Sequence, residues 1–177
     1  MATFEDNMAT FEDLCRHRRS IRSYTDRPVE QEKIDYLLRC ALMSPSSKRT
    51  NPWEFIVVRD IDKLRAMSAC RTYGSGMFTT AMAAIVVALD TTQSDTWMAD
   101  GAIAAEHILL AAEEQGLGAC WCQIYNREGA EDLIRELCAI PNERTVLCVI
   151  SLGYKNEERK CYDLEKLLYT KIHNEKY

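Results

Sequence analysis

Four arginines fall within seven residues near the start of the chain, at Arg16, Arg18, Arg19 and Arg22, and Ser20 lies among them. A guanidinium group donates parallel hydrogen bonds to a pair of phosphate oxygens, and a serine hydroxyl adds another donor. Clustered cations repel one another, and an anion bound among them removes that cost. The segment therefore predicts a phosphate-bearing ligand. A solvated basic turn is the alternative that this segment, taken alone, leaves open.

Two further segments have the composition of ligand-binding loops. Residues 44–55 read SPSSKRTNPWEF, whose short polar side chains and backbone amides can bond the edge of a heteroaromatic ring while Trp53 anchors the loop. Residues 116–123 read GLGACWCQ, where glycine lets the backbone approach a flat ligand. Taken alone, the first segment is also explained as an ordinary loop between a helix and a strand. The second is also explained as the end of a helix followed by a buried strand. Neither is a dinucleotide fingerprint, because no G-x-G-x-x-G follows a strand.

The overall composition excludes several classes of protein. The chain has 177 residues and a net charge of −5, which suits one domain and argues against nucleic acid or an anionic membrane as the partner. No apolar run reaches the roughly 18 residues that span a bilayer. Acids stand where a signal peptide would be basic, so we expect a cytoplasmic protein. Eight scattered cysteines without a C-x-x-C pair suit reduced core thiols, and three separated histidines predict no metal site.

The hexapeptide MATFED occurs twice, at residues 1–6 and 8–13. This duplication is much shorter than the repeats of solenoid proteins. We interpret residues 1–7 as an added or alternative start and expect a single domain over residues 8–177.

Hydrophobic periodicity predicts an α+β domain with about six helices and four short strands. The predicted helices are residues 11–18, 30–43, 60–70, 77–83, 97–115 and 130–137, and the predicted strands are residues 53–58, 84–89, 120–124 and 145–152. The longest helix places Ala99, Ile103, His107 and Leu110 on one face. Because this helix is apolar on several sides, a subunit interface is one explanation of it.

Taken together, these segments resemble the nitroreductase-like FMN-dependent oxidoreductases. The run from Arg18 to Arg22 is similar to the family's R-R-S-x-R phosphate motif, and residues 45–55 to its P-S-x-x-x-x-x-P-W-x-F loop. Residues 116–121 resemble its G-L-G-x-x-W element. Gly153 and Tyr154, followed by a basic pair, resemble the family ending. The resemblance runs from about residue 11 to residue 163.

The resemblance implies roles for individual residues in binding FMN. The phosphate would be held by Arg18, Ser20 and Arg22, with Arg19 on the ribityl or pyrimidine side and either Arg159 or Lys160 joining from the C-terminal side. The flavin ring would be contacted by Pro45, Ser46 and Ser47 of the partner subunit and bordered near N5 by Trp121, Cys122 and Gln123.

Two positions depart from the family pattern. Arg49 stands where the family often has Asn, and Asn51 where it often has Gln. These positions usually shape the flavin edge or the mouth of the active site. Arg49 adds positive charge there, which would favour an anionic substrate or an anionic reduced flavin.

The resemblance also implies a fold and an activity. The fold would have a small central mixed β-sheet of about four strands, surrounded by helices, and would allow a swapped C-terminal strand. The protein would be a homodimer with FMN at the interface, reduced by NADH or NADPH and then oxidised by a nitroaromatic or quinone in ping-pong turnover. Alternatives are another redox reaction on the same scaffold, such as flavin fragmentation or dehalogenation, and a non-catalytic protein that stores FMN.

Overall fold

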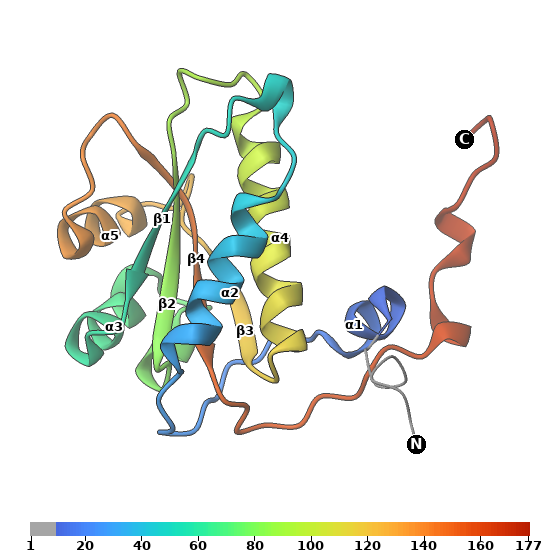
Figure 1. Ribbon diagram of the computed structural model, residues 1–177, viewed down its shortest axis with the longest axis horizontal. Coiled ribbons are helices and arrows are strands. Elements are labelled where there is room, and N and C mark those ends of the chain that lie inside the picture. Colours follow the sequence, from blue (N-terminus) through green and yellow to red (C-terminus); the bar gives the residue numbers. More distant parts are fainter. Residues whose placement is uncertain (1–9) are drawn as a thin grey trace.

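The chain forms a four-stranded β-sheet with helices on both faces, as Figure 1 shows in a computed structural model that describes residues 10–177. The strands are β1 (Trp53–Val58), β2 (Ala83–Leu89), β3 (Gly118–Gln123) and β4 (Thr145–Gly153), in the spatial order β1-β2-β4-β3. The predicted α+β class and its four strands are confirmed. The proposed added start, residues 1–7, lies outside the described part of the chain.

The resemblance predicted a mixed sheet, but the observed sheet is antiparallel. All three strand pairs, β1–β2, β2–β4 and β4–β3, are antiparallel. Strands β2 and β3 run in the same direction, but β4 lies between them, so they form no parallel pair. Among residues 10–177 the parallel pairing is limited to a single bridge between Ser20 and Ala119.

The α-helices are α1 (Phe11–His17), α2 (Gln31–Leu42), α3 (Ile61–Met67), α4 (Trp97–Glu114) and α5 (Ala130–Cys138). Thr10 and Asp13 form a capping box at the start of α1, and the Asp60 side chain caps α3. The predicted helix at residues 77–83 is instead a 3-10 turn, Gly76–Thr79, because Ala83 already belongs to β2. None of the described helices is long and apolar enough to cross a membrane.

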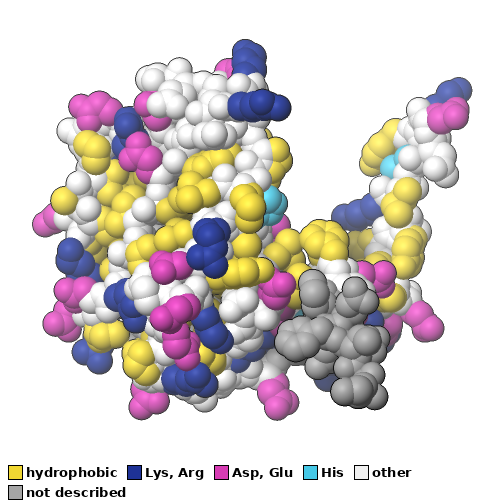
Figure 2. Space-filling view, in the orientation of Figure 1, with side chains coloured by type: hydrophobic (Ala, Val, Ile, Leu, Met, Phe, Trp, Pro, Cys, Tyr) yellow, Lys and Arg dark blue, Asp and Glu magenta, His cyan; other side chains and the backbone are white. Residues whose placement is uncertain are grey.

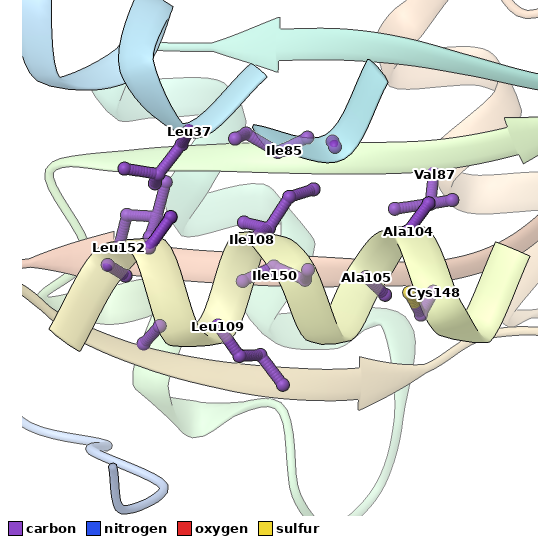
Figure 3. Close-up of a cluster of buried hydrophobic side chains, with 14 of the residues drawn as sticks. Leu37, Ile85, Val87, Ala104, Ala105, Ile108, Leu109, Cys148, Ile150 and Leu152 are labelled. Atoms are coloured by element: carbon purple, nitrogen blue, oxygen red, sulfur yellow. The ribbon is translucent and has the colours of Figure 1, made fainter. Parts of the chain in front are cut away.

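The two faces of the sheet bury separate hydrophobic clusters. Helices α2 and α4 cover one face, and α3 and α5 cover the other (Figure 1). Strand β2 is buried along its whole length, as expected of a continuous apolar strand covered on both faces. In the α4 cluster, Ile108 and Ala104 point toward Ile85, Val87 and Ile150 of the sheet (Figure 3).

Small residues on α4 allow the helix to lie close to the sheet. A Cβ atom at Gly101 would meet Leu147 Cδ2 at 2.8 Å and Leu89 Cδ2 at 2.9 Å. The face predicted from Ala99, Ile103, His107 and Leu110 is the less buried side of α4, and Ile103 is exposed. Alanine-rich helices have weak amphipathic patterns, so the pattern did not distinguish the core face from the free one.

The C-terminal segment leaves the body of the protein after β4 (Figure 1). It contains two 3-10 turns, Leu164–Lys166 and Tyr169–Lys171, and no strand is assigned within described residues 154–177. Its large exposed apolar side chains are Tyr162, Leu167, Leu168, Tyr169, Ile172 and Tyr177. A strand swapped with a second chain therefore stays a prediction.

A buried tyrosine joins the N-terminal arginine segment to the sheet. The Tyr24 hydroxyl donates to the Ile21 carbonyl at 2.6 Å and lies 2.7 Å from the Ser151 hydroxyl on β4. The ring packs so closely on β4 that a Cβ atom at Gly153 would meet the Tyr24 ring atoms Cδ1 and Cγ at 2.9 Å. Burial raises the pKa of Tyr24 well above its usual value, so the hydroxyl stays protonated and available as a donor.

We predict that Tyr24→Phe lowers the free energy of unfolding by about 1–3 kcal/mol, because the buried Ile21 carbonyl loses its donor. Urea titration monitored by circular dichroism measures the change. Tyr73→Phe is the matched control, since the Tyr73 side chain is 84% exposed. Equal stability of the two variants would contradict the structural role given to the Tyr24 hydroxyl.

Candidate functional site

A polar cavity of about 210 Å³ lies where the arginine segment meets the C-terminal segment. Its lining residues are Arg18, Arg19, Ser20, Arg22, Arg159 and Tyr162. The structure thus brings the four residues predicted from the N-terminal motif together with Arg159, which is distant in sequence. Four guanidinium groups around one small cavity can bind an anionic group by charge-assisted hydrogen bonds.

Edge strand β3 fixes the position of the arginine segment. Ser20 forms a bridge with Ala119, and the Ile21 amide donates to the Ala119 carbonyl at 3.0 Å. The contact requires glycine at position 118, because a Cβ atom there would meet Ile21 Cβ at 2.8 Å. The glycine-rich turn predicted to approach a ligand therefore also seats the arginine segment on the sheet.

The cations of the cavity differ in how they are held. Arg19 donates to the Lys160 carbonyl at 2.6 Å and lies over the Tyr162 ring, 4.5 Å from its centroid. Arg18 is 3.8 Å from the Glu106 carboxylate on α4. Of the two C-terminal candidates, Arg159 lines the cavity and Lys160 contributes a carbonyl contact.

Glu157 links the two segments that build the cavity. One carboxylate oxygen accepts the backbone N–H of Arg22, and the other lies 2.6 Å from the Arg159 guanidinium. The Arg22 N–H, with a smaller contribution from Arg159, lowers the pKa of Glu157 despite some opposing desolvation. The Glu157 carboxylate therefore pairs with Arg159, and a bound anion would compete with it for the Arg159 guanidinium.

The predicted ring-edge residues lie on β3, and their side chains alternate between the faces of the sheet. Trp121 packs with the α4 cluster, and its indole N–H donates to Gln123 Oε1 at 3.0 Å. Cys122 is buried in the cluster on the opposite face, where its thiol contacts the Gly74 carbonyl at 3.6 Å. Trp121 and Gln123 are thus brought together, whereas the Cys122 side chain points away from them.

The second predicted loop, residues 45–51, lies against the first turn of α4. Asp100 is buried, and its carboxylate accepts the Ser47 N–H at 2.9 Å and the Ser94 hydroxyl at 2.6 Å. Lys48, Arg49 and Asn51 have φ values of 52°, 58° and 47°. The left-handed region costs non-glycine residues roughly 1–2 kcal/mol each. The contacts around the loop must offset this strain.

Within one chain, this loop and the arginine segment lie near opposite ends of α4. Asp100 holds the loop near the start of the helix, and Ser20 lies beside β3, which begins just after the helix ends. The cavity also extends back along the helix, because Arg18 lies 3.8 Å from Glu106, which is about 9 Å along the axis from Asp100. Pro45, Ser46 and Ser47 do not line the cavity at the arginine segment of the same chain.

Three residues that build these sites were not predicted from the sequence: Glu157, Tyr162 and Asp100. Glu157 and Tyr162 flank the predicted basic pair, Arg159 and Lys160. Their closeness to this pair in the sequence is the feature that could have indicated them. Asp100 is the acid in the first turn of a long apolar helix. Its contact with Ser47 spans 53 residues, and no local pattern indicates such a contact.

Comparison with known proteins supports the resemblance drawn from the motifs. The Nitroreductase family model matches residues 15–73 and 68–154. A protein of Archaeoglobus fulgidus, with a proposed NADH dehydrogenase/NAD(P)H nitroreductase activity, is 42% identical over 165 residues, which cover 90% of this chain and 94% of that protein. The chain belongs to the nitroreductase family and is an oxidoreductase.

Solved structures share the fold. An FMN-dependent nitroreductase of Clostridium difficile is 45% identical with a TM-score of 0.89, covering 93% of this chain and 98% of that one. A proposed nitroreductase of Desulfovibrio desulfuricans, solved in complex with FMN, is 28% identical with a TM-score of 0.74, covering 89% of this chain and 94% of that one. The predicted nitroreductase-like fold is thereby confirmed.

We predict that the stability of the wild type falls relative to Glu157→Gln as the pH is lowered from about 6 to about 3. A carboxyl group with a depressed pKa stabilises the folded state above its unfolded value, near 4.5, and this contribution is lost as the pH falls through the folded value. Unfolding free energies measured by urea titration at each pH test this. Glu158→Gln, at an exposed neighbour, should follow the wild type, and parallel profiles for all three proteins would contradict the prediction.

Proposed function

We propose that this protein is an FMN-dependent NAD(P)H oxidoreductase that reduces nitroaromatic or quinone acceptors. The cavity formed by Arg18, Arg19, Ser20, Arg22 and Arg159 is the observation that carries the proposal. It joins two distant segments around one concentration of positive charge in a protein whose net charge is −5.

The charges and donors of the cavity suit a phosphate group. Four guanidinium groups face the carboxylates of Glu106 and Glu157, which leaves two positive charges for a phosphate dianion.

Strand β3 provides a path from the phosphate cavity to a ring site. At about 3.3 Å per residue, Trp121 and Gln123 lie roughly 7 Å and 13 Å along the strand from Ala119. Ala119 is the bridge partner of Ser20. A ligand lying along this edge would place its phosphate by Ser20 and a flat ring by Trp121. Cys122 would take part through its backbone, since its side chain is on the other face.

A homodimer would complete this site. The loop at residues 45–51 does not line the cavity at the arginine segment of its own chain. The family resemblance implies that the loop of a second copy would contact the ring. A groove of about 250 Å³ is available for such an interface. It is lined by Phe11, Leu14, Cys40, Met43, His107, Leu110, Ala111 and Glu114. Figure 2 shows apolar side chains between α2 and α4 and along the C-terminal segment.

A bound FMN would supply two-electron transfer between NADH or NADPH and the acceptor. The protein's residues would bind and orient it: the arginines at the phosphate, Trp121 and Gln123 at the ring edge, and Lys160 through the carbonyl that holds Arg19. No side-chain acid–base pair is assigned a catalytic role.

The activity is tested by reconstituting the purified protein with FMN and following NADH and NADPH oxidation with a nitroaromatic and a quinone. Turnover with either acceptor supports the proposal. A tightly bound flavin that neither nicotinamide reduces would favour FMN storage. Turnover confined to halogenated aromatics, or loss of flavin under air, would favour dehalogenation or flavin fragmentation.

We predict that replacing Arg18 and Arg22 together by alanine weakens FMN binding about 100-fold or more, because each charge-assisted hydrogen bond contributes roughly 1.5–3 kcal/mol. Quenching of flavin fluorescence measures the Kd. Riboflavin, which lacks the phosphate, should bind wild type and variant alike. Arg65→Ala/Arg127→Ala removes the same charge from exposed positions and should leave the Kd for FMN unchanged. An unchanged Kd in the Arg18/Arg22 variant would rule out the phosphate site.

We predict that Met43→Glu converts a dimer into a monomer, because a carboxylate would be buried in the proposed apolar interface. Met43 is 72% exposed in the single chain, so the substitution should not unfold it. Light scattering coupled to size-exclusion chromatography gives the mass. Tyr73→Glu, at a residue that is also exposed but outside the groove, should remain dimeric. A wild-type protein that is monomeric at all concentrations would refute the dimer.

A further inference from the structure

The loop at residues 45–51 presents two consecutive cations on a strained backbone. Lys48 and Arg49 are both exposed, and both have left-handed φ values. Within residues 10–177 neither side chain is paired with a carboxylate, although the sequence holds 27 acids. Figure 2 shows basic side chains at the end of the body where α4 begins.

Contacts on both sides hold this loop in place. Asp100 fixes its first half through the Ser47 N–H, as described above. Contacts between its two ends close the loop, because the Ser46 hydroxyl donates to Asn51 Oδ1 at 2.9 Å and accepts the Asn51 N–H at 3.0 Å. The conformation is therefore set by the loop and α4 before any ligand binds. A receptor organised in advance avoids the entropic cost of ordering its groups on binding.

We propose that Lys48 and Arg49 bind the carboxylate, or an equally acidic group, of an anionic electron acceptor. The proposal rests on the proposed function, in which this loop borders the ring of the cofactor held by the second chain. The Arg49 guanidinium can donate two parallel hydrogen bonds to a carboxylate, and the Lys48 ammonium adds a point charge. The strain is consistent with selection for presenting these cations, since strained non-glycine backbone concentrates at functional sites.

The test compares two acceptors of the same shape, 4-nitrobenzoate and neutral 4-nitrobenzamide, with the FMN-loaded protein. The variant is Lys48→Met/Arg49→Met, which removes two exposed charges and keeps the length of the side chains. We expect the KM for 4-nitrobenzoate to rise about 10- to 100-fold and the KM for 4-nitrobenzamide to change less than about twofold. Lys63→Met/Arg65→Met, which removes the same charge from the exposed side of α3, should change neither KM.

Calorimetric titration of the oxidised, FMN-loaded protein with 4-nitrobenzoate gives a reading independent of turnover, and its Kd should rise in parallel with the KM. The proposal is overturned if both acceptors are weakened equally, or if neither is affected. It is also overturned if the KM for NADH or NADPH rises instead, because the cations would then serve the dinucleotide phosphates. A wild type that binds 4-nitrobenzoate through these residues but reduces no acceptor would refute the proposed function, and with it the role of the bound anion as an electron acceptor, while the carboxylate site at Lys48 and Arg49 would stand.

Discussion

The close packing of α4 against the sheet is the constraint on which both candidate sites depend. Gly101 and the neighbouring alanines leave no room for larger side chains between the helix and β4. Because the helix cannot shift along the sheet without collisions, its two ends become fixed reference points. Asp100 at one end sets the strained loop, and the turn into β3 at the other sets the arginine segment.

Local sequence patterns predicted most of the fold because neighbouring residues determine it. Strand β1 has the predicted bounds, residues 53–58, and α4 ends one residue before the predicted position. The resemblance also predicted that Arg18, Arg19, Ser20 and Arg22 gather with either Arg159 or Lys160, and Arg159 is the one that lines the cavity. The prediction of a mixed sheet was wrong. Strand β4 lies between β2 and β3, and this order is a property of the whole sheet that local patterns do not indicate.

Long-range polar contacts were not predictable in the same way. The tertiary fold decides which group a carboxylate such as Glu157 or Asp100 contacts. The spacing of residues along the chain does not indicate that partner. The sequence likewise did not show which face of α4 packs on the sheet. When most positions of a helix are small and apolar, composition alone does not say which side meets the protein's own sheet.

The separation of the phosphate cavity from the strained loop has a genetic consequence if the site is shared between two chains. A chain defective only in its arginines would retain a working loop, and a chain defective only in its loop would retain a working cavity. A mixed assembly of the two would contain one site built entirely from intact parts. Two inactive alleles could then restore activity to each other, and a single defective allele would not abolish the activity of the mixed dimers it joins.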